Sequence, residues 1–325
     1  MNKNKIKMLL KNNKKIYNIV SYIYVFLFDH KRLGKKRKYG NKNSDKSILL
    51  IRPNSEDGIQ GLMSLFIQTI RWVEYANRKG MIPFIDFKNY KTQYSDGTNV
   101  WEYFFSQPSA LTIEEVYESK NVVISGTTLY PQVNDKLFRG EVFFDEKLCK
   151  NCYHAIWDNI KLNEKVENVV REENINIHVE NCIGAYLRGT DYIRLKPSGE
   201  YVQPQIDEFI EKLGEFVRKY PEKNIFLVTE DDMYFTKIRE CFGDKVKTVS
   251  FDSFIKNYNE STYLSKTGVL NKDKYKRGMD YLVKIVLLSR CEQFVGSITM
   301  GSIAAYTLNG GNYKEKYIFD LGLYQ

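Results

Sequence analysis

The sequence has few histidines, cysteines and prolines, and the apolar run near its N-terminus is short. Its 325 residues include three His, five Cys and seven Pro. The run at 16–28, "IYNIVSYIYVFLF", has 13 residues, whereas a membrane-spanning helix needs about 20. No small-residue cleavage site follows it. We therefore expect neither a spanning helix nor a cleaved signal peptide there.

The cysteines predict free, buried thiols in a reducing compartment, because their number is odd and most lie in apolar stretches. They are Cys149, Cys152, Cys182, Cys241 and Cys291. The motif "CKNCYH" at 149–154 resembles half of a zinc site, but no second Cys/His pair completes four ligands. We expect no metal site.

Positive charge is concentrated in the first 40 residues. They carry twelve Lys/Arg against one Asp, a net charge of +11, so the other 285 residues together carry −2 of the total +9. Lysines flanking an aromatic run favour a segment lying on an anionic membrane surface. A packed N-terminal helix with a basic linker is the alternative. We expect residues 1–45 to form a basic amphipathic arm on the cytoplasmic face of the cell membrane, and no nucleic-acid binding.

The remainder alternates strands and helices, which predicts two Rossmann-like domains at 46–175 and 176–325. Apolar runs predict strands at 46–53, 81–86 and 121–126 in the first half, and at 181–188, 224–231, 245–251, 293–297 and 316–322 in the second. A helical apolar stripe begins at Leu62, a helix is expected near 161–173, and the stretch 281–291 is apolar nearly all round. The polar stretch 255–278 is expected to be a loop over the cleft between the domains.

Three strand ends in the second half carry polar clusters. These are "LRGTDY" with Arg188, Gly189 and Asp191, "LVTEDD" at 227–232, and "FVGSITMGS" at 294–302. Ligands of open parallel sheets bind beyond such strand ends. Hydroxyls and N–H groups at a helix start suit a diphosphate, and an arginine can receive the negative charge that a departing phosphate develops. The alternatives are a structural Arg–Asp pair and ordinary helix caps.

In this order the motifs resemble the fucosyltransferase superfamily of α1,6-, nodulation-type and protein O-fucosyltransferases. The resemblance rests on "AYLRGTDY", "LVTEDD", "LLSRCEQFVGSITMGSIAAY" and the early loop "EDGIQG", and it covers residues 47–325. It implies a GT-B fold, an inverting and metal-independent reaction, and GDP-fucose as donor, with no cofactor.

The resemblance also implies roles for individual residues. Arg188 would bind the β-phosphate, and Glu200 would be the catalytic base with Asp191 as fallback. The donor-binding set would be Gly58, Arg188, Gly189, Thr229, Asp231, Asp280, Ser297, Thr299 and Ser302. Three positions depart from the family pattern: Tyr186 replaces a histidine, Gly189 an arginine, and Lys284 an acid.

The residues independently favour a carboxylate as base, because none of His30, His154 and His178 lies at a strand end. We thus expect a fucosyltransferase acting on a hydroxyl of a bacterial surface glycan or lipid-linked oligosaccharide. Use of another nucleotide sugar, or binding of glycan or nucleotide without catalysis, remain alternatives. The acceptor, the linkage and the oligomeric state are not determined by the sequence.

Overall fold

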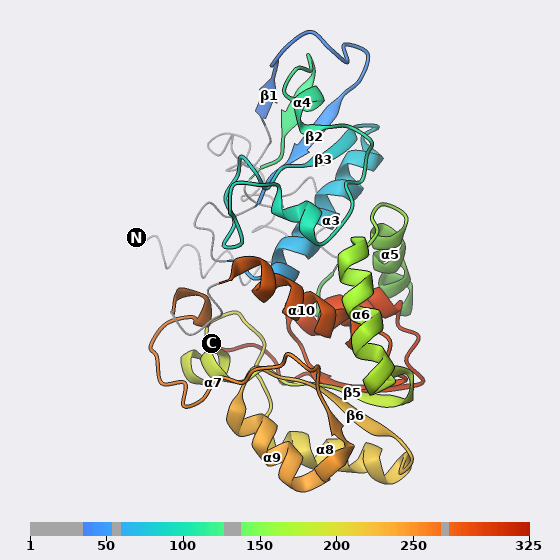
Figure 1. Cartoon of the computed structure of the whole chain (residues 1–325), viewed down its shortest axis with the longest axis vertical. Helices are drawn as coiled ribbons and strands as arrows, with labels where there is room; N and C mark the ends of the chain where they lie inside the picture. The colour runs from blue at the N-terminus through green and yellow to red at the C-terminus, as the bar shows by residue number, and fades with distance from the viewer. Residues whose placement is uncertain (1–34, 54–59, 127–137, 268–272) are drawn as a thin grey trace, which may run out of the picture.

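The structure is a computed structural model that describes residues 35–53, 60–126, 138–267 and 273–325. It contains two β-sheets at opposite ends of the long axis, with helices between them (Figure 1). The apolar run at 16–28 and Gly58 lie outside the described residues. Among the residues described, no helix combines the length and apolarity needed to cross a bilayer.

The first sheet has four strands in the order β1-β4-β2-β3. These are β1 (Lys35–Arg37), β4 (Val122–Ile124), β2 (Ile48–Ile51) and β3 (Ile82–Ile85). Strands β4, β2 and β3 are parallel, while β1 pairs antiparallel with β4. Helix α3 (Leu62–Arg78) connects β2 to β3 and buries most of its apolar side chains. The three parallel strands match the prediction, and the edge strand β1, built from basic residues, was not predicted.

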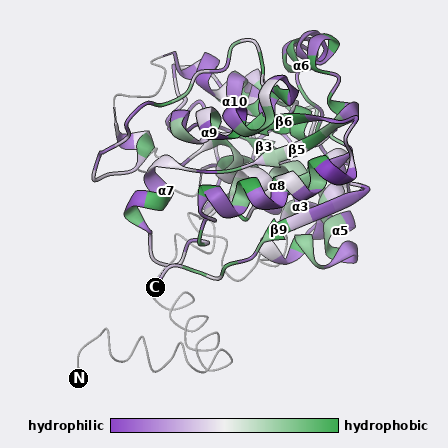
Figure 2. Ribbon diagram, turned by 90° about the horizontal axis from the view of Figure 1, so that it is seen from below, coloured by the Kyte–Doolittle hydropathy of each residue, from purple (hydrophilic) through white to green (hydrophobic). Residues whose placement is uncertain are grey.

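The second sheet has five parallel strands in the order β7-β6-β5-β8-β9. They are β5 (Cys182–Tyr186), β6 (Asn224–Val228), β7 (Val246–Lys247), β8 (Gln293–Ser297) and β9 (Glu315–Phe319). The connecting helices include α8 (Ile206–Lys219), α9 (Asp232–Phe242) and α11 (Met300–Asn309). In Figure 2 the strands at the centre are mostly hydrophobic, and the helices around them turn hydrophilic residues outward.

Helices join the two sheets through one apolar core. Helix α10 (Lys274–Leu288) lies between the sheets (Figure 1) and contacts α3, α6 (Glu164–Ile177) and α11. The largest cluster of buried side chains runs from β2 through these helices to β8. The two ends are therefore held together by hydrophobic packing. The predicted domain boundary at 175/176 stays a prediction.

Several expected elements have different bounds in the structure. The strand expected at 245–251 covers only Val246–Lys247, and α10 begins seven residues earlier than the apolar stretch indicated. Asp273 explains that early start, because its carboxylate accepts a hydrogen bond from the Lys276 N–H and caps the helix. The structure also contains the helix α5 (Glu146–Trp157), which was not predicted.

Helix α5 carries two of the cysteines. Cys149 and Cys152 are fully buried, and burial raises the pKa of the Cys149 thiol to about 12 and that of Cys152 to about 11. Both are therefore protonated thiols at neutral pH, which suits packing rather than reactivity. Among the described residues, no group of three or more His, Cys, Asp or Glu is placed to hold a metal ion.

Candidate functional site

The candidate site lies where β5 and β8 end side by side. Tyr186 of β5 is paired with Gly296 of β8, yet the chain continues from β5 toward β6 on one side and from β8 toward β9 on the other. The connections after the two strands therefore diverge, which is the topology at which open parallel sheets bind ligands. Arg188 follows β5 at this point, and α11 follows β8.

Arg188 is held between acids and an aromatic ring. Its Nη2 donates to Asp191 Oδ1 at 3.1 Å, its Nε lies 4.0 Å from Glu230 Oε1, and its guanidinium carbon lies 4.3 Å from the centre of the Tyr192 ring. The buried Nε has no hydrogen-bond partner among the described residues, and 26% of the side chain is exposed. The guanidinium is thus partly paired and partly open to a ligand.

The acids keep this guanidinium charged. Burial lowers the pKa of Arg188, but the negative charges of Glu230 and Asp191 outweigh that effect and raise it well above its ordinary value. For Glu230, burial raises the carboxyl pKa, and the positive charge of Arg188 only partly offsets it. A fixed cation is therefore present at any physiological pH.

The turn after β5 is fastened to the end of β6. The Gly189 N–H donates to Glu230 Oε1 at 3.2 Å, and the Thr190 N–H donates to Asp231 Oδ2 at 3.1 Å. Thr190 adopts a φ of 46°, a strained conformation for a β-branched residue, which these hydrogen bonds help to hold. A Cβ at Gly189 would lie 2.6 Å from Asp231 Oδ2, so only glycine fits.

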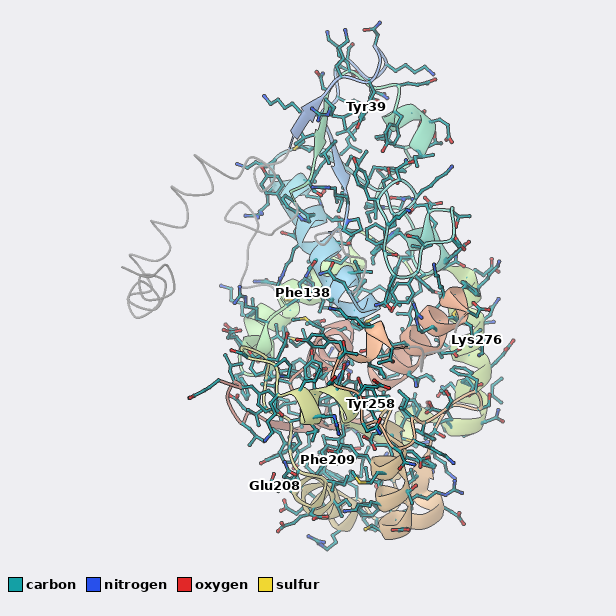
Figure 3. All side chains as sticks on the ribbon, turned by 90° about the vertical axis from the view of Figure 1, so that its left-hand side faces the viewer. Tyr39, Phe138, Glu208, Phe209, Tyr258 and Lys276 are labelled. Atoms are coloured by element: carbon teal, nitrogen blue, oxygen red, sulfur yellow. The ribbon has the colours of Figure 1, made fainter. Side chains whose placement is uncertain are left out.

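Asp191 links Arg188 to a segment far away in sequence. Its carboxylate is 2% exposed, and Oδ2 accepts a hydrogen bond from the Leu264 N–H at 2.9 Å. The same segment is tied to the end of β6, because the Ile255 N–H donates to the Glu230 carbonyl at 2.8 Å. Tyr258 of this segment lies in the lower half of Figure 3, between the labelled Phe138 and Phe209. The part of the predicted cleft loop at 255–267 thus packs beside Arg188.

The predicted hydroxyl cluster forms the start of α11. Ser297 and Ser302 are fully buried, with Ser297 Oγ donating to Gln203 Oε1 and Ser302 Oγ donating to the Ser297 carbonyl at 2.6 Å. Thr299 is the N-cap of α11, and its Oγ1 accepts from the Gly301 and Ser302 N–H groups. The helix start is therefore capped from within, and the predicted contacts of these hydroxyls with a diphosphate stay predictions.

Two tyrosines meet this helix start: Tyr186, which the sequence marked as replacing the family histidine, and Tyr281, which the sequence did not indicate. Thr299 Oγ1 donates to the Tyr186 hydroxyl at 3.2 Å, and the Tyr186 and Tyr281 hydroxyls lie 3.5 Å apart. A Cβ at Gly301 would lie within 2.5 Å of both hydroxyls. Burial raises the pKa of both tyrosines, so both hydroxyls stay protonated and can donate. Tyr186, at the position of the family histidine, is thus buried against the start of α11.

The other predicted donor contacts have partners of their own. Asp231 Oδ1 caps α9 by accepting from the Met233 and Tyr234 N–H groups, and Thr229 Oγ1 accepts from the Asp231 N–H at 3.3 Å. Asp280 pairs with Lys276 one turn away at 3.0 Å. Thr229 and Asp231 lie at the end of β6 beside Arg188, and Asp280 lies on α10. Their roles toward a ligand are not tested by this geometry.

Glu200 lies in an exposed loop that the C-terminus holds. The Tyr324 N–H donates to the Glu200 carbonyl at 2.9 Å, and the Val202 N–H donates to the Gly322 carbonyl at 3.0 Å. Burial is the main reason that the pKa of Tyr192 is raised, and the charge of Glu200 adds to it. Glu200 is therefore near the ring that stacks on Arg188, with its carboxylate open to solvent.

Comparison with known proteins identifies the fold. The structure is similar to POFUT1 in complex with GDP, with a TM-score of 0.51, 10% sequence identity, and coverage of 86% of this chain and 100% of that chain. Fucosyltransferase NodZ from Bradyrhizobium has a TM-score of 0.45 and 14% identity, with coverage of 80% of this chain and 92% of that chain. A mutant of Arabidopsis thaliana FUT1 in complex with GDP has a TM-score of 0.48 and 9% identity, with coverage of 94% of this chain and 79% of that chain. No family model and no curated protein sequence matches the chain. The chain therefore has a fucosyltransferase-like α/β fold of the GT-B type, as its motif order predicted.

Proposed function

We propose that this protein is an inverting glycosyltransferase that transfers fucose from GDP-fucose to a hydroxyl group of a glycan. The fold it shares with POFUT1, solved in complex with GDP, supports a nucleotide-sugar donor. A POFUT1 structure with GDP-fucose is similar as well, with a TM-score of 0.50 and 10% identity. The observation that carries the proposal is the half-paired guanidinium of Arg188 just beyond the end of β5, where the connections after β5 and β8 diverge.

In the proposed reaction, the acceptor oxygen attacks the anomeric carbon on the face opposite the diphosphate. The bond from that carbon to the β-phosphate oxygen breaks, and the departing phosphate takes the electron pair. Arg188 faces the charge that develops, with Nε and Nη1 as the donors that Asp191 does not occupy. Glu200 accepts the proton from the acceptor hydroxyl.

The surroundings of the two candidate bases favour different roles for them. Asp191 is almost completely buried, and its two oxygens are engaged by Arg188 and by the Leu264 N–H. It is suited to hold the guanidinium in place rather than to meet an acceptor. The carboxylate of Glu200 is exposed and close to Tyr192, so an acceptor can reach it.

A diphosphate bound at the start of α11 would compete with the internal cap. The Gly301 and Ser302 N–H groups now donate to Thr299 Oγ1. Helix N-termini bind phosphates through such N–H groups. We infer that the Thr299 side chain turns from cap to ligand when the donor binds, and that neither a metal ion nor a cofactor takes part in the reaction.

The acceptor and the location are part of the same proposal. The basic arm at 1–45 supports an enzyme held on the cytoplasmic face of the cell membrane, acting on a surface glycan or a lipid-linked oligosaccharide in polysaccharide biosynthesis. A truncated chain that lacks residues 1–34 keeps β1 in the first sheet and should lose binding to vesicles that contain anionic lipid. If the truncated chain binds them as well as the full chain, membrane attachment through the arm is wrong.

A panel of nucleotide sugars tests the function. GDP-fucose should raise the melting temperature most, since a ligand stabilises the state it binds, and GDP should be released faster with a hydroxyl acceptor than without. Stronger stabilisation by another nucleotide sugar would mean that this sugar, and not GDP-fucose, is the donor. Tyr186, which stands in place of the family histidine, makes this a specific alternative. Stabilisation without any release of nucleoside diphosphate would indicate a binding protein.

A further inference from the structure

A hollow of about 660 Å³ lies beside the free edge of β3, built from residues outside the Arg188 site. We call it the edge hollow. Its lining includes Phe84, Lys88, Asn99, Glu102, Phe105 and Gln107. Its volume is within the range of about 300–1,000 Å³ that is typical of small-ligand sites.

Side chains in the edge hollow already occupy the edge of the strand. The Ile85 N–H donates to Gln107 Oε1 at 2.9 Å, and the Ile85 carbonyl accepts from Asn99 Nδ2 and Gln107 Nε2, each at 2.8 Å. Ser109 Oγ donates to the Pro83 carbonyl, and Pro83 has no N–H. A peptide therefore cannot bind here by adding a strand to the sheet.

The same amides form a rigid polar wall. Asn99 Nδ2 and Gln107 Nε2 both donate to Glu102 Oε1, at 2.9 and 2.8 Å. Because these side chains are fixed before any ligand arrives, binding costs little side-chain entropy. Phe84 and Phe105 lie behind this wall and are only 1% and 2% exposed, so the apolar surface that a ligand can reach comes from the half-buried Leu111 and Ile113 of the lining. Aliphatic surface of this kind suits the C–H faces of a sugar ring.

The charge of the edge hollow is nearly neutral. Among its lining residues only Lys88, Glu102 and Glu114 are charged, which gives a net charge of −1. A phosphorylated or polyanionic ligand would find no cationic cluster here. The N–H groups of both amides are already used, but the Asn99 and Gln107 side-chain oxygens each accept only one backbone N–H and can accept a second hydrogen bond from a ligand hydroxyl. Acceptors of this kind beside an apolar surface match a neutral ligand that is rich in hydroxyl groups.

We propose that the edge hollow is a binding site for a neutral oligosaccharide. If the proposed function also holds, this site binds the part of the acceptor glycan that lies away from the reacting hydroxyl. The lining segment packs against α10, with the Tyr103 ring 5.2 Å and the Phe104 ring 6.1 Å from the Tyr275 ring. Aromatic packing thus holds the lining segment against α10.

The test uses the full chain on an array of immobilised neutral and acidic oligosaccharides of two to six sugars. Two variants fill the hollow from different elements: Lys88→Trp and Glu114→Trp. The two substitutions remove charges of opposite sign, so a loss of oligosaccharide binding that both variants share results from filling the hollow and not from the change in charge. Lys91→Trp, on an exposed residue three positions from Lys88 and outside the lining, is the matched control. Melting temperatures check that each variant is folded.

We expect the wild type to retain neutral oligosaccharides, and both filling variants to lose this retention at least tenfold. Lys91→Trp and Arg188→Ala should retain them as the wild type does. The proposal is overturned if the wild type retains no neutral oligosaccharide, if the filling variants bind normally, or if Arg188→Ala alone abolishes retention. The last result would place the glycan at Arg188. Loss of transfer in Arg188→Ala tests the proposed function separately.

Discussion

Replacing Arg188 with alanine should reduce turnover strongly while leaving the fold intact. Nη2 is tied to Asp191, so Nε and Nη1 remain for the leaving diphosphate, although the buried Nε can donate to it only if the surrounding side chains shift when the donor binds. A hydrogen bond that involves a charged group contributes about 1.5–3 kcal/mol, so two of them contribute about 3–6 kcal/mol. At about 1.4 kcal/mol for each tenfold change, kcat should fall by about 10²- to 10⁴-fold.

The assay measures GDP release from GDP-fucose in the presence of acceptor. Arg188→Lys keeps the charge but loses the planar fork, and it should fall between the wild type and the alanine variant. Arg194→Ala, at an exposed position on α7 (Thr190–Leu195), is the matched control and should keep wild-type turnover.

Loss of the cation also leaves Asp191 buried with less compensation, so Arg188→Ala should unfold at a lower temperature. Assays that are run 20 °C below the melting temperature of Arg188→Ala separate its loss of stability from its loss of catalysis. Turnover within about threefold of the wild type in folded Arg188→Ala would refute the reasoning.

Three further changes follow from the geometry. Glu200→Gln should lower kcat about 10²-fold or more with little change in the KM for the donor, because the proton acceptor is lost while the Arg188 contacts remain. The control Glu211→Gln, at an exposed position, should leave kcat unchanged. If Glu200→Gln also leaves kcat unchanged, Glu200 is not the base. Gly189→Ala should destabilise the protein by about 1–3 kcal/mol in urea unfolding, because its Cβ would lie 2.6 Å from Asp231 Oδ2, whereas Gly61→Ala should be nearly neutral because no atom lies within 4 Å. Equal effects of the two glycine changes would contradict this account. Glu292 pairs with Lys223 and Lys314, whose hydrogen bonds lower its pKa to about 2 from the ordinary 4.5, so the stabilisation is present above pH 4.5 and is lost as the pH falls toward 2. Because these ion pairs lie near the surface, their stabilisation should amount to about 1 kcal/mol, measured as the difference in unfolding free energy between the wild type and Glu292→Gln at pH 7. This difference should shrink between pH 4.5 and pH 2, and a difference independent of pH would contradict the prediction.

The sequence predicted the parts of this molecule that depend on local pattern. The apolar run "NCIGAYLR" predicts β5 and places Arg188 just after its end. The runs "NIFLV" and "QFVGS" predict β6 and β8 in the same way, and polar residues follow each of them. Their polar ends converge because parallel strands of one sheet present their carboxyl ends at the same edge. For this reason the central cation could be located before its surroundings were known.

Only the near neighbours of Arg188, Asp191 and Tyr192, could be read from the local sequence, and the pairing of Arg188 with Asp191 was one of the alternatives. The rest of the site could not be predicted, because it comes from residues far apart in the chain. The contact of Asp191 with the Leu264 N–H spans 73 positions, and that of Tyr186 with Tyr281 spans 95. Whether Asp191 faces a substrate or a loop backbone depends on tertiary packing, which no local pattern reports. The sequence did not predict the edge hollow for a similar reason, since Asn99 and Gln107 are single amides in irregular segments.

The most direct test is a crystal structure of the full chain with GDP. The account predicts that the β-phosphate lies within hydrogen-bond distance of Arg188 Nε or Nη1, in front of the α11 N-terminus, with Asp191 still on Nη2. If GDP binds elsewhere, or if the phosphate makes no contact with the guanidinium, the role given to Arg188 is wrong.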